Sequence, residues 1–217
     1  MRRYIHSLIC FVFCSSMAIA QPQPGNWMMC FGTIKMDSHW SIHLEAQHRN
    51  YTIQPQLEQL LLRSGVNYKF DNGRMLTGGY AKINNHDYQS PRFAPEIEEH
   101  RVWQQLSAFN FFGKLKMEHR FRYEQRWIES TYRTRFRYRG MLFYPLNTVS
   151  IEVGTYYIGI YDELFLQPGL NNFDRNRLYG GLGYKVSPNV QMQVGYLLQT
   201  VGSTSREYLQ FGLILDH

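Results

Sequence analysis

Residues 114–143 read KLKMEHRFRYEQRWIESTYRTRFRYRGMLF, a stretch in which ionic and apolar side chains alternate almost throughout. From Lys114 to Arg126 every even position is charged, whereas most odd positions are aliphatic or aromatic. From Arg133 to Arg139 every second residue is an arginine. Side chains of a β-strand point alternately to opposite faces, so this stretch predicts a hairpin with one ionic and one apolar face.

The length of the two strands indicates where such a hairpin belongs. Each strand runs for about thirteen residues, whereas strands in soluble proteins usually have about five or six. A transmembrane barrel uses long strands with apolar residues toward lipid and polar residues toward the interior. The sequence therefore predicts an all-β fold, an antiparallel transmembrane β-barrel with a charged lumen.

Residues 1–20 have the pattern of a secretory signal peptide. The start, MRR, is basic, residues 5–13 are mostly apolar, and residues 18–20, AIA, form a small-residue cleavage site. We expect cleavage near Ala20, so that residues 21–217 form one exported barrel domain. The expected location is the outer membrane of a Gram-negative bacterium.

The chain has three cysteines, two of which lie in the predicted signal peptide. Cys14 would suit a lipoprotein signal, but the bulky Phe13 before it does not. Cys30 is then the single cysteine of the mature chain, so we expect no intramolecular disulfide.

The formal net charge of +6 does not indicate nucleic-acid binding, because the basic residues follow predicted strands instead of gathering in one patch or tail. No second apolar stretch approaches the roughly 18 residues of a membrane helix. A mean hydropathy of −0.41 is compatible with a barrel, in which only alternate residues need be apolar. We expect outer-membrane lipid and the barrel-assembly machinery as partners, with no cofactor, and the sequence identifies no specific protein partner.

Turn residues divide the mature chain into alternating segments. Bacterial barrels have an even number of strands, and we expect about ten, from 39–49, which rises from the periplasm, to 206–216, which returns to it. The segment 27–36 is then surplus, either another strand in a barrel of about twelve or a piece folded into the lumen. The segments are 27–36, 39–49, 59–70, 74–84, 98–109, 113–128, 132–143, 148–162, 175–186, 190–201 and 206–216.

The connections differ in length, which predicts the orientation. Barrels of this class have short periplasmic turns and longer external loops. We expect the turns at 71–73, 110–112, 145–147 and 187–189 to face the periplasm, and the loops at 51–58, 85–97 and 163–174 to face outward.

Sequence parity predicts the lipid face, and aromatic residues near strand ends predict the interfacial girdles. The lipid face should carry Trp40, Ile42, Leu44, Ala46, Val149, Ile151, Val153, Tyr157, Leu178, Leu182, Tyr184, Val186, Val190, Met192, Val194, Tyr196, Leu198, Leu209, Phe211, Leu213 and Leu215. The girdles should include Trp40, Trp127, Phe143, Tyr161 and Tyr184.

The opposite parity predicts a charge network in the lumen. Unpaired buried charge is costly, so arginines and glutamates there should pair in ladders. The network should consist of Glu99, Arg101, Glu118, Arg120, Arg122, Glu124, Arg133, Arg135, Arg137, Glu152, Arg175 and Arg177, with Glu45, Arg49, Arg126, Arg139 and Lys185 beside it.

Several stretches carry a resemblance to a known family. They are Trp27, WSIHLEAQHR at 40–49, EHRVWQQ at 99–105, EHRFRYEQR at 118–126, YDELF at 161–165 and NFDRNRLYGGLGY at 172–184. They resemble the family labelled domain of unknown function 2490 over nearly the whole mature chain. The resemblance implies an outer-membrane barrel of a Bacteroidetes-type bacterium and carries no established activity. The chain departs from the usual assembly signal, because it ends in Leu215-Asp-His217 without a terminal aromatic residue.

The sharpest catalytic candidate is the set Ser41, His43 and Glu45, which share one parity of one strand. Residues two apart on a strand lie about 6.5–7 Å apart, which is long for direct activation of a serine by a histidine. His119 has a parity that points it toward lipid, but it has no serine near it in the sequence. We therefore assign no catalytic residues.

Metal binding has one weak candidate, because Asp162, Glu163 and Asp174 lie in or beside one predicted external loop. Oxygen ligands suit a divalent cation, but the spacing is unlike a calcium-binding loop. A structural clasp with Arg175 and Arg177 explains these residues better. We therefore assign no metal site.

Three functions remain open. The first is a non-enzymatic outer-membrane barrel with a structural, accessory or narrow-pore role, which the sequence favours. The second is an outer-membrane hydrolase that modifies lipid, and the third is a soluble exported β-sandwich or lipocalin-like binder.

Overall fold

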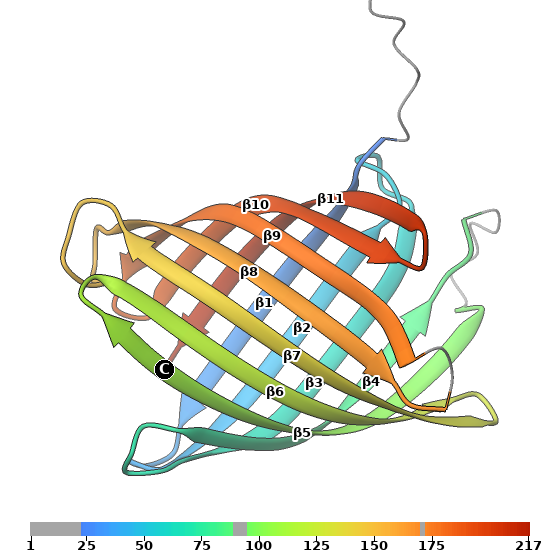
Figure 1. Ribbon diagram of the computed structural model, residues 1–217, viewed down its shortest axis with the longest axis horizontal. Helices are drawn as coiled ribbons and strands as arrows, with labels where there is room; N and C mark the ends of the chain where they lie inside the picture. The colour runs from blue at the N-terminus through green and yellow to red at the C-terminus, as the bar shows by residue number, and fades with distance from the viewer. Residues whose placement is uncertain (1–22, 89–94, 170–171) are drawn as a thin grey trace, which may run out of the picture.

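The computed structural model describes residues 23–88, 95–169 and 172–217, so the predicted signal peptide lies outside the described residues. The described chain forms a closed barrel of eleven strands, which confirms the all-β barrel prediction (Figure 1). No helix in the described part is long and apolar enough to cross a membrane. The strands are β1 Gly25–Lys35, β2 Trp40–Asn50, β3 Leu57–Lys69, β4 Met75–Asn85, β5 Ile97–Phe112, β6 Leu115–Ile128, β7 Thr131–Pro145, β8 Tyr156–Gln167, β9 Asn172–Ser187, β10 Val190–Val201 and β11 Thr204–Asp216.

The eleven strands lie between the expected ten and the alternative of twelve, and the segment 27–36 accounts for the odd number. It forms β1, which pairs antiparallel with β2 and parallel with β11. Gly25 lies opposite Tyr208 and Thr33 opposite Asp216, so the barrel closes through one parallel pair. Because β1 and β11 run in the same direction, β1 begins at one end of the barrel and β11 finishes at the other.

The two ends of the barrel are named here by their first connections. The β1–β2 end also carries the β3–β4, β5–β6, β7–β8 and β9–β10 connections, and the β2–β3 end carries the other five. This grouping follows from the alternating directions of consecutive strands. The β7–β8 connection spans 146–155 and is much longer than the predicted turn at 145–147.

That long connection corrects the strand predicted at 148–162. Side chains of the connection bond with nearby backbone N–H groups. Asn147 Oδ1 accepts a hydrogen bond from the Tyr156 N–H at 2.8 Å, and Thr155 Oγ1 accepts one from the Glu152 N–H at 3.0 Å. Strand β8 therefore begins at Tyr156. Several residues predicted on the lipid face or in the girdles therefore lie elsewhere. Val149, Ile151 and Val153 lie in the connection, and Tyr157 and Tyr161 are buried inside the barrel. Phe143 lines the interior cavity.

The turn between β1 and β2 is fixed by one carboxylate. Asp37 Oδ1 accepts the backbone N–H groups of His39 and Trp40, both at 2.7 Å. These two donors lower the pKa of the Asp37 carboxyl. The turn reverses the chain directly after β1, so the first segment joins the wall as half of a hairpin.

The predicted central hairpin is present as β6 and β7. Glu124 lies opposite Arg135 in the register of the pair, and both side chains are buried inside the barrel. Phe121 and Phe136 lie on the opposite face and are exposed. The alternation in the sequence therefore corresponds to an ionic inner face and an apolar outer face.

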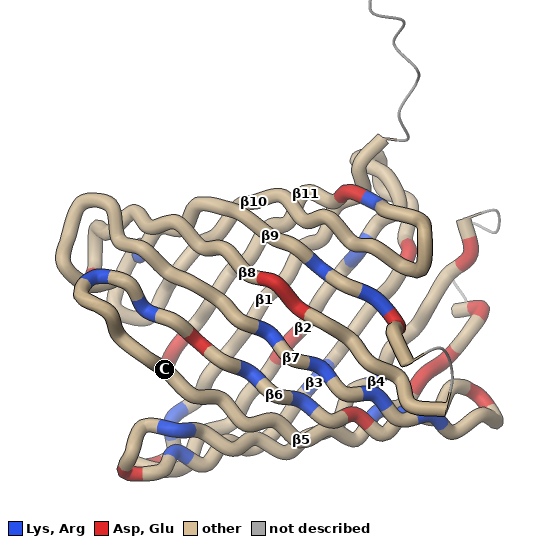
Figure 2. The backbone as a smooth tube through the Cα atoms, viewed as in Figure 1, with Lys and Arg blue, Asp and Glu red and all other residues tan. Residues whose placement is uncertain are grey.

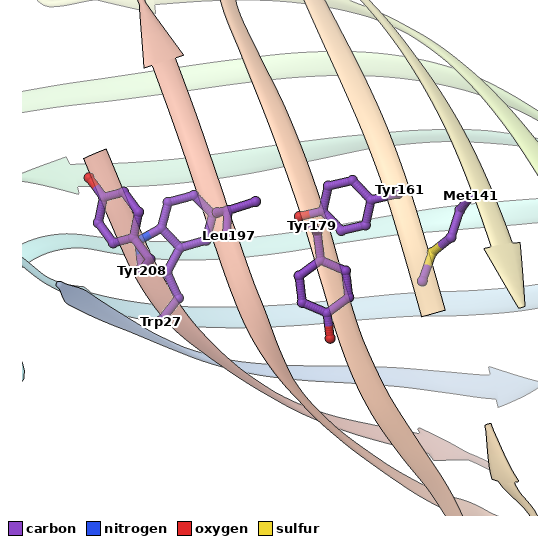
Figure 3. Close-up of a cluster of buried hydrophobic side chains, with 6 residues drawn as sticks. All are labelled: Trp27, Met141, Tyr161, Tyr179, Leu197 and Tyr208. Atoms are coloured by element: carbon purple, nitrogen blue, oxygen red, sulfur yellow. The ribbon is translucent and has the colours of Figure 1, made fainter. Parts of the chain in front are cut away.

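Large apolar side chains fill the parts of the interior that charges do not occupy. Figure 3 shows one cluster, in which the Trp27 and Tyr208 rings lie together, with ring centroids 4.8 Å apart. A second cluster lies around Trp103 on β5. Gly79 gives the Trp103 ring its space, because a Cβ at Gly79 would lie 2.8 Å from that ring and closer still to the Ser64 carbonyl oxygen.

Candidate functional site in the lumen

The site begins with the β6–β7 hairpin, whose inward residues are almost all charged. Figure 2 shows the charged positions distributed along these strands. In the register of the pair, Arg120 lies opposite Arg139 and Arg122 opposite Arg137. Like charges directly opposite each other are destabilising, so these arginines require carboxylates on a diagonal or on other strands.

Glu124 supplies the first such carboxylate. Its Oε2 accepts hydrogen bonds from Arg135 Nε at 2.9 Å and Nη2 at 2.6 Å, and its Oε1 accepts one from Arg137 Nη1 at 2.7 Å. Arg101 and Arg122 each place an Nη1 atom 3.8 Å from the same carboxylate. The Glu124 side chain is 0% exposed, so these arginines replace its solvation by water.

Glu163 supplies the second carboxylate, which the sequence placed in a clasp with Arg175 and Arg177 beside an external loop and not in the lumen network. Its Oε1 accepts hydrogen bonds from Arg120 Nη2 at 2.6 Å and Arg137 Nη2 at 2.8 Å. Arg177 Nη1 lies 4.0 Å from Oε2. Glu163 was expected in an external loop because β8 was predicted to end near 162, but β8 continues to Gln167 and buries it.

Two further carboxylates also pair with interior arginines. Glu99 pairs with Arg101, at 2.5 and 2.9 Å, and with Arg126, at 2.5 and 3.1 Å. Glu118 accepts one hydrogen bond from Arg139 Nη2 at 2.7 Å. The structure therefore joins Glu99, Arg101, Arg120, Arg122, Glu124, Arg135, Arg137 and Arg177 in one interior network of ion pairs. The pair of Glu118 with Arg139 is a separate interior pair.

Three other predicted members have different positions. Glu152 lies in the β7–β8 connection, outside the strands and exposed, so its expected place in the lumen was wrong. Arg175 lines the cavity and donates a hydrogen bond to its neighbour Asp174. Asp174 also accepts a hydrogen bond from Arg135 Nη1 at 3.0 Å. Arg133 lies opposite Arg126 near the β2–β3 end and is half-buried.

An ion pair between Arg63 and Glu45 lies apart from this network. Arg63 Nη1 donates to Glu45 Oε2 at 2.7 Å, and both side chains are buried. The sequence pattern predicts Glu45 inside the barrel but does not predict Arg63 there. The three consecutive leucines at 60–62 hide the alternation there, although Asn67 on the same parity would have indicated the inner face.

The cavity inside the barrel has a volume of about 600 Å³. Eleven arginines and five glutamates line it, so its wall carries an excess of positive charge. Ten of these arginines have a carboxylate oxygen within 4.0 Å, but they share only six carboxylates, and Arg49 has none within that distance among the described residues. The chemistry available in the lumen is therefore the binding of anionic groups.

The candidate catalytic residues do not form a working arrangement. Ser41 Oγ accepts a hydrogen bond from Asn67 Nδ2 at 2.9 Å, while His43 Nε2 lies 3.3 Å from Glu45 Oε2. Ser41 is thus paired with an amide rather than with the histidine. His119 lies on the outer side, where its Nδ1 pairs with the Tyr138 hydroxyl at 2.8 Å.

The candidate metal ligands point to different faces. Asp162 is exposed and accepts a hydrogen bond from Asn176 Nδ2 at 2.8 Å. Glu163 and Asp174 instead pair with arginines inside the barrel. Within residues 23–88, 95–169 and 172–217, no group of three or more histidine, cysteine, aspartate or glutamate residues is placed to hold a metal ion.

A family model described as protein of unknown function (DUF2490) matches residues 24–210. The chain belongs to the DUF2490 family. An uncharacterized protein of Methylorubrum extorquens is 28% identical to this DUF2490 chain over 228 residues, which cover 99% of this chain and 93% of that protein. No solved structure matches. These matches identify neither an activity nor a Bacteroidetes-type source, so the expected source stays a prediction.

The DUF2490 barrel should depend much more on Glu124 than on Glu118. Glu124→Gln should lower the free energy of unfolding by about 3–5 kcal/mol, because Arg135 and Arg137 lose a wholly buried partner. Glu118→Gln should cost clearly less, because that carboxylate serves only Arg139 and lies nearer solvent. Urea unfolding of the two variants in detergent measures the difference, and equal losses would show that Glu124 is not central.

Proposed function

We propose that this DUF2490 protein is an outer-membrane β-barrel of a Gram-negative bacterium with a structural, accessory or narrow-pore role rather than a catalytic one. The observation that carries the proposal is an apolar outer surface around the whole barrel. Every strand contributes at least one large, exposed, outward apolar side chain. They include Met28, Leu44, Leu62, Val66, Leu76, Leu106, Phe121, Phe136, Ile160, Leu178, Leu182, Met192, Val194 and Phe211.

An apolar surface of this extent does not suit a water-soluble monomer. Soluble monomers rarely expose continuous apolar patches larger than a few hundred Å². Closure of the barrel pairs both edges of every strand, which is the condition for placing a β-sheet in hydrocarbon. The two features together favour a membrane protein over a lipocalin-like binder.

Aromatic residues near both ends of the barrel support the same proposal. At the β1–β2 end, the Trp40 and Tyr68 rings lie 4.8 Å apart and the Tyr156 and Tyr184 rings 4.5 Å apart. At the β2–β3 end, the ring centroids of Trp127 and Tyr132 lie 5.4 Å apart. Girdles of aromatic side chains are typical of the two interfaces of a transmembrane barrel.

Charged side chains on the outer face mark where the apolar band of the barrel ends. Lys82 and Glu98 form an ion pair of 3.2 Å on the outer face near the β2–β3 end, and both are exposed. Glu207 lies near the same end, close to the start of β11. The strands thus extend beyond the apolar band at this end, as the external end of an outer-membrane barrel does.

Fractionation and gel mobility test the proposal directly. The mature protein should fractionate with the outer membrane and resist extraction by carbonate or high salt, because apolar outer side chains anchor it. On unboiled detergent gels it should migrate differently from the heated protein, because a closed barrel resists mild detergent. Release by carbonate alone would contradict the membrane assignment.

A pair of outward valines tests the depth of the membrane band. Val194→Arg should impair assembly strongly, since an arginine near the midplane of a bilayer costs about 2–4 kcal/mol. Val186→Arg is the matched control, because Val186 is similarly exposed but lies at the end of β9, where the cost falls to about 0–1 kcal/mol. The folded fraction after refolding into lipid vesicles measures both, and equal yields would contradict a lipid-facing Val194.

Conductance tests whether the lumen is open. Interior contacts join distant strands, since Tyr161 on β8 bonds with Gln210 on β11 and Tyr208 on β11 bonds with Glu58 on β3. Planar-bilayer recordings of the wild type should therefore show little or no steady current. The double substitution Glu118→Ala with Glu124→Ala should raise the current or weaken the barrel. Large, stable, anion-selective channels from the unchanged protein would instead identify a porin.

A further inference from the structure

Three lumen arginines donate side-chain hydrogen bonds to glutamines and none to a carboxylate among the described residues. Arg122 donates to Gln105 and lies 3.8 Å from Glu124. Arg49 and Arg177 are the other two.

Arg49 donates from Nε to Gln47 Oε1 at 3.0 Å and from Nη1 to Gln59 Oε1 at 2.6 Å. Arg177 donates from Nε to Gln199 Oε1 at 2.8 Å. Among the described residues no carboxylate accepts a hydrogen bond from either guanidinium, and the Glu163 oxygen paired with Arg177 lies 4.0 Å away.

These two arginines meet at one ring. The guanidinium carbon of Arg49 lies 4.0 Å from the centroid of Trp27, and that of Arg177 lies 4.7 Å from it. Trp27 is 2% exposed, and its indole Nε1–H has no hydrogen-bond acceptor among the described residues. All three residues line the lumen cavity.

The charge of Arg49 and Arg177 is compensated only in part, because the nearest Glu163 oxygen lies 4.0 Å from Arg177 and Glu58 is the other neighbouring carboxylate. In the network around Glu124 and Glu163, arginines share carboxylates at hydrogen-bond distance. At Trp27 the glutamines orient Arg49 and Arg177 but leave their charge in place. Several guanidinium N–H groups and the indole N–H therefore have donor capacity that the described residues do not use.

We propose that Arg49, Arg177 and Trp27 form a binding site for an oxyanion of the phosphate class. A guanidinium presents a planar fork of donors that matches two oxygens of a phosphate group, and two such forks provide the charge that a phosphate needs. Stacking on Trp27 holds the forks in place. The cavity of about 600 Å³ has room for a larger solute that carries the phosphate group, as well as for the free ion.

Glu58 defines one side of the site. Its Oε1 accepts a hydrogen bond from the Tyr208 hydroxyl at 3.3 Å, and the Tyr208 ring packs on Trp27. The site thus combines the neighbouring Glu58 carboxylate with two guanidinium groups that donate to no carboxylate among the described residues. This arrangement favours a ligand that has a neutral portion next to its anionic group. The inference depends on the closed barrel but does not depend on its membrane location.

Calorimetric titration of the purified, folded barrel in non-ionic detergent tests the site. Inorganic phosphate and glycerol phosphate are added separately in chloride buffer at constant ionic strength. Saturable heat with at least one of them is expected. Tighter binding of glycerol phosphate would identify a solute-borne group as the natural ligand class, and tighter binding of inorganic phosphate would identify the free ion. The absence of saturable heat with both would overturn the proposal.

Single substitutions assign the binding to these residues. Arg177→Gln and Arg49→Gln should each weaken binding by about tenfold or more, because each removes one charged fork. Arg175→Gln is the matched control, since it removes a lumen arginine that already bonds with Asp174, and it should bind as the wild type does. Equal weakening in all three variants would show a general effect of lumen charge and overturn the site.

A conservative variant keeps the test decisive if a glutamine variant fails to fold. Arg177→Lys retains the positive charge but loses the planar fork. It should fold and bind phosphate several-fold more weakly than the wild type. Unchanged affinity in folded Arg177→Lys, together with unchanged affinity in Arg49→Lys, would contradict recognition by the guanidinium groups.

Discussion

The bonds from Arg135 and Arg137 to the Glu124 carboxylate are the interaction on which the rest of the structure depends. A closed barrel with an apolar outer face leaves most charged side chains in the middle of its strands only one place, the interior. There a carboxylate without partners would be too costly, and Glu124 is wholly buried. The same bonds fix the β6–β7 register, because a slip of one residue would turn every charge to the outer face.

The remaining carboxylates spread this pairing over one side of the barrel. Glu163 on β8 bonds with arginines of β6 and β7, and Glu99 on β5 pairs with Arg126 on β6. Apolar clusters fill other parts of the interior, with Trp27 packed on Tyr208, and Tyr179 packed against Gly181 and Gly195. The interior therefore combines an ionic network with apolar clusters, and Arg49 and Arg177 both contact Trp27 of one such cluster.

The sequence predicts the ionic hairpin well because its period of two continues through both strands without interruption. It fails at β8, because Val149, Ile151 and Val153 keep the same period inside a connection that is not a strand. That error moved Glu163 into a loop and placed Glu152 in the lumen. Periodicity reports which face a residue would take in a strand, but hydrogen bonds such as those of Thr155 decide where the strand begins.

The parallel closure and the lumen cluster were beyond sequence analysis for a related reason. No local pattern shows that β1 pairs with β11, since the two strands lie at opposite ends of the chain. Predicted parity places Arg49 in the lumen, but its contact with Arg177 at Trp27 requires β1, β2 and β9 to be arranged around one interior.

The closing seam and the proposed anion site occupy the same part of the barrel. Parallel pairing is slightly less stable per residue than antiparallel pairing, so the β1–β11 pair needs support from inside. Trp27 on β1 packs on Tyr208 of β11, and Arg49 of β2 stacks on Trp27. Backbone bonds between His217 and both Thr33 and Lys35, at 2.8 and 2.7 Å, hold the other end of the seam. An anion between Arg49 and Arg177 would remove the repulsion beside Trp27, and so it would stabilise the closure of the barrel as well as occupy its lumen.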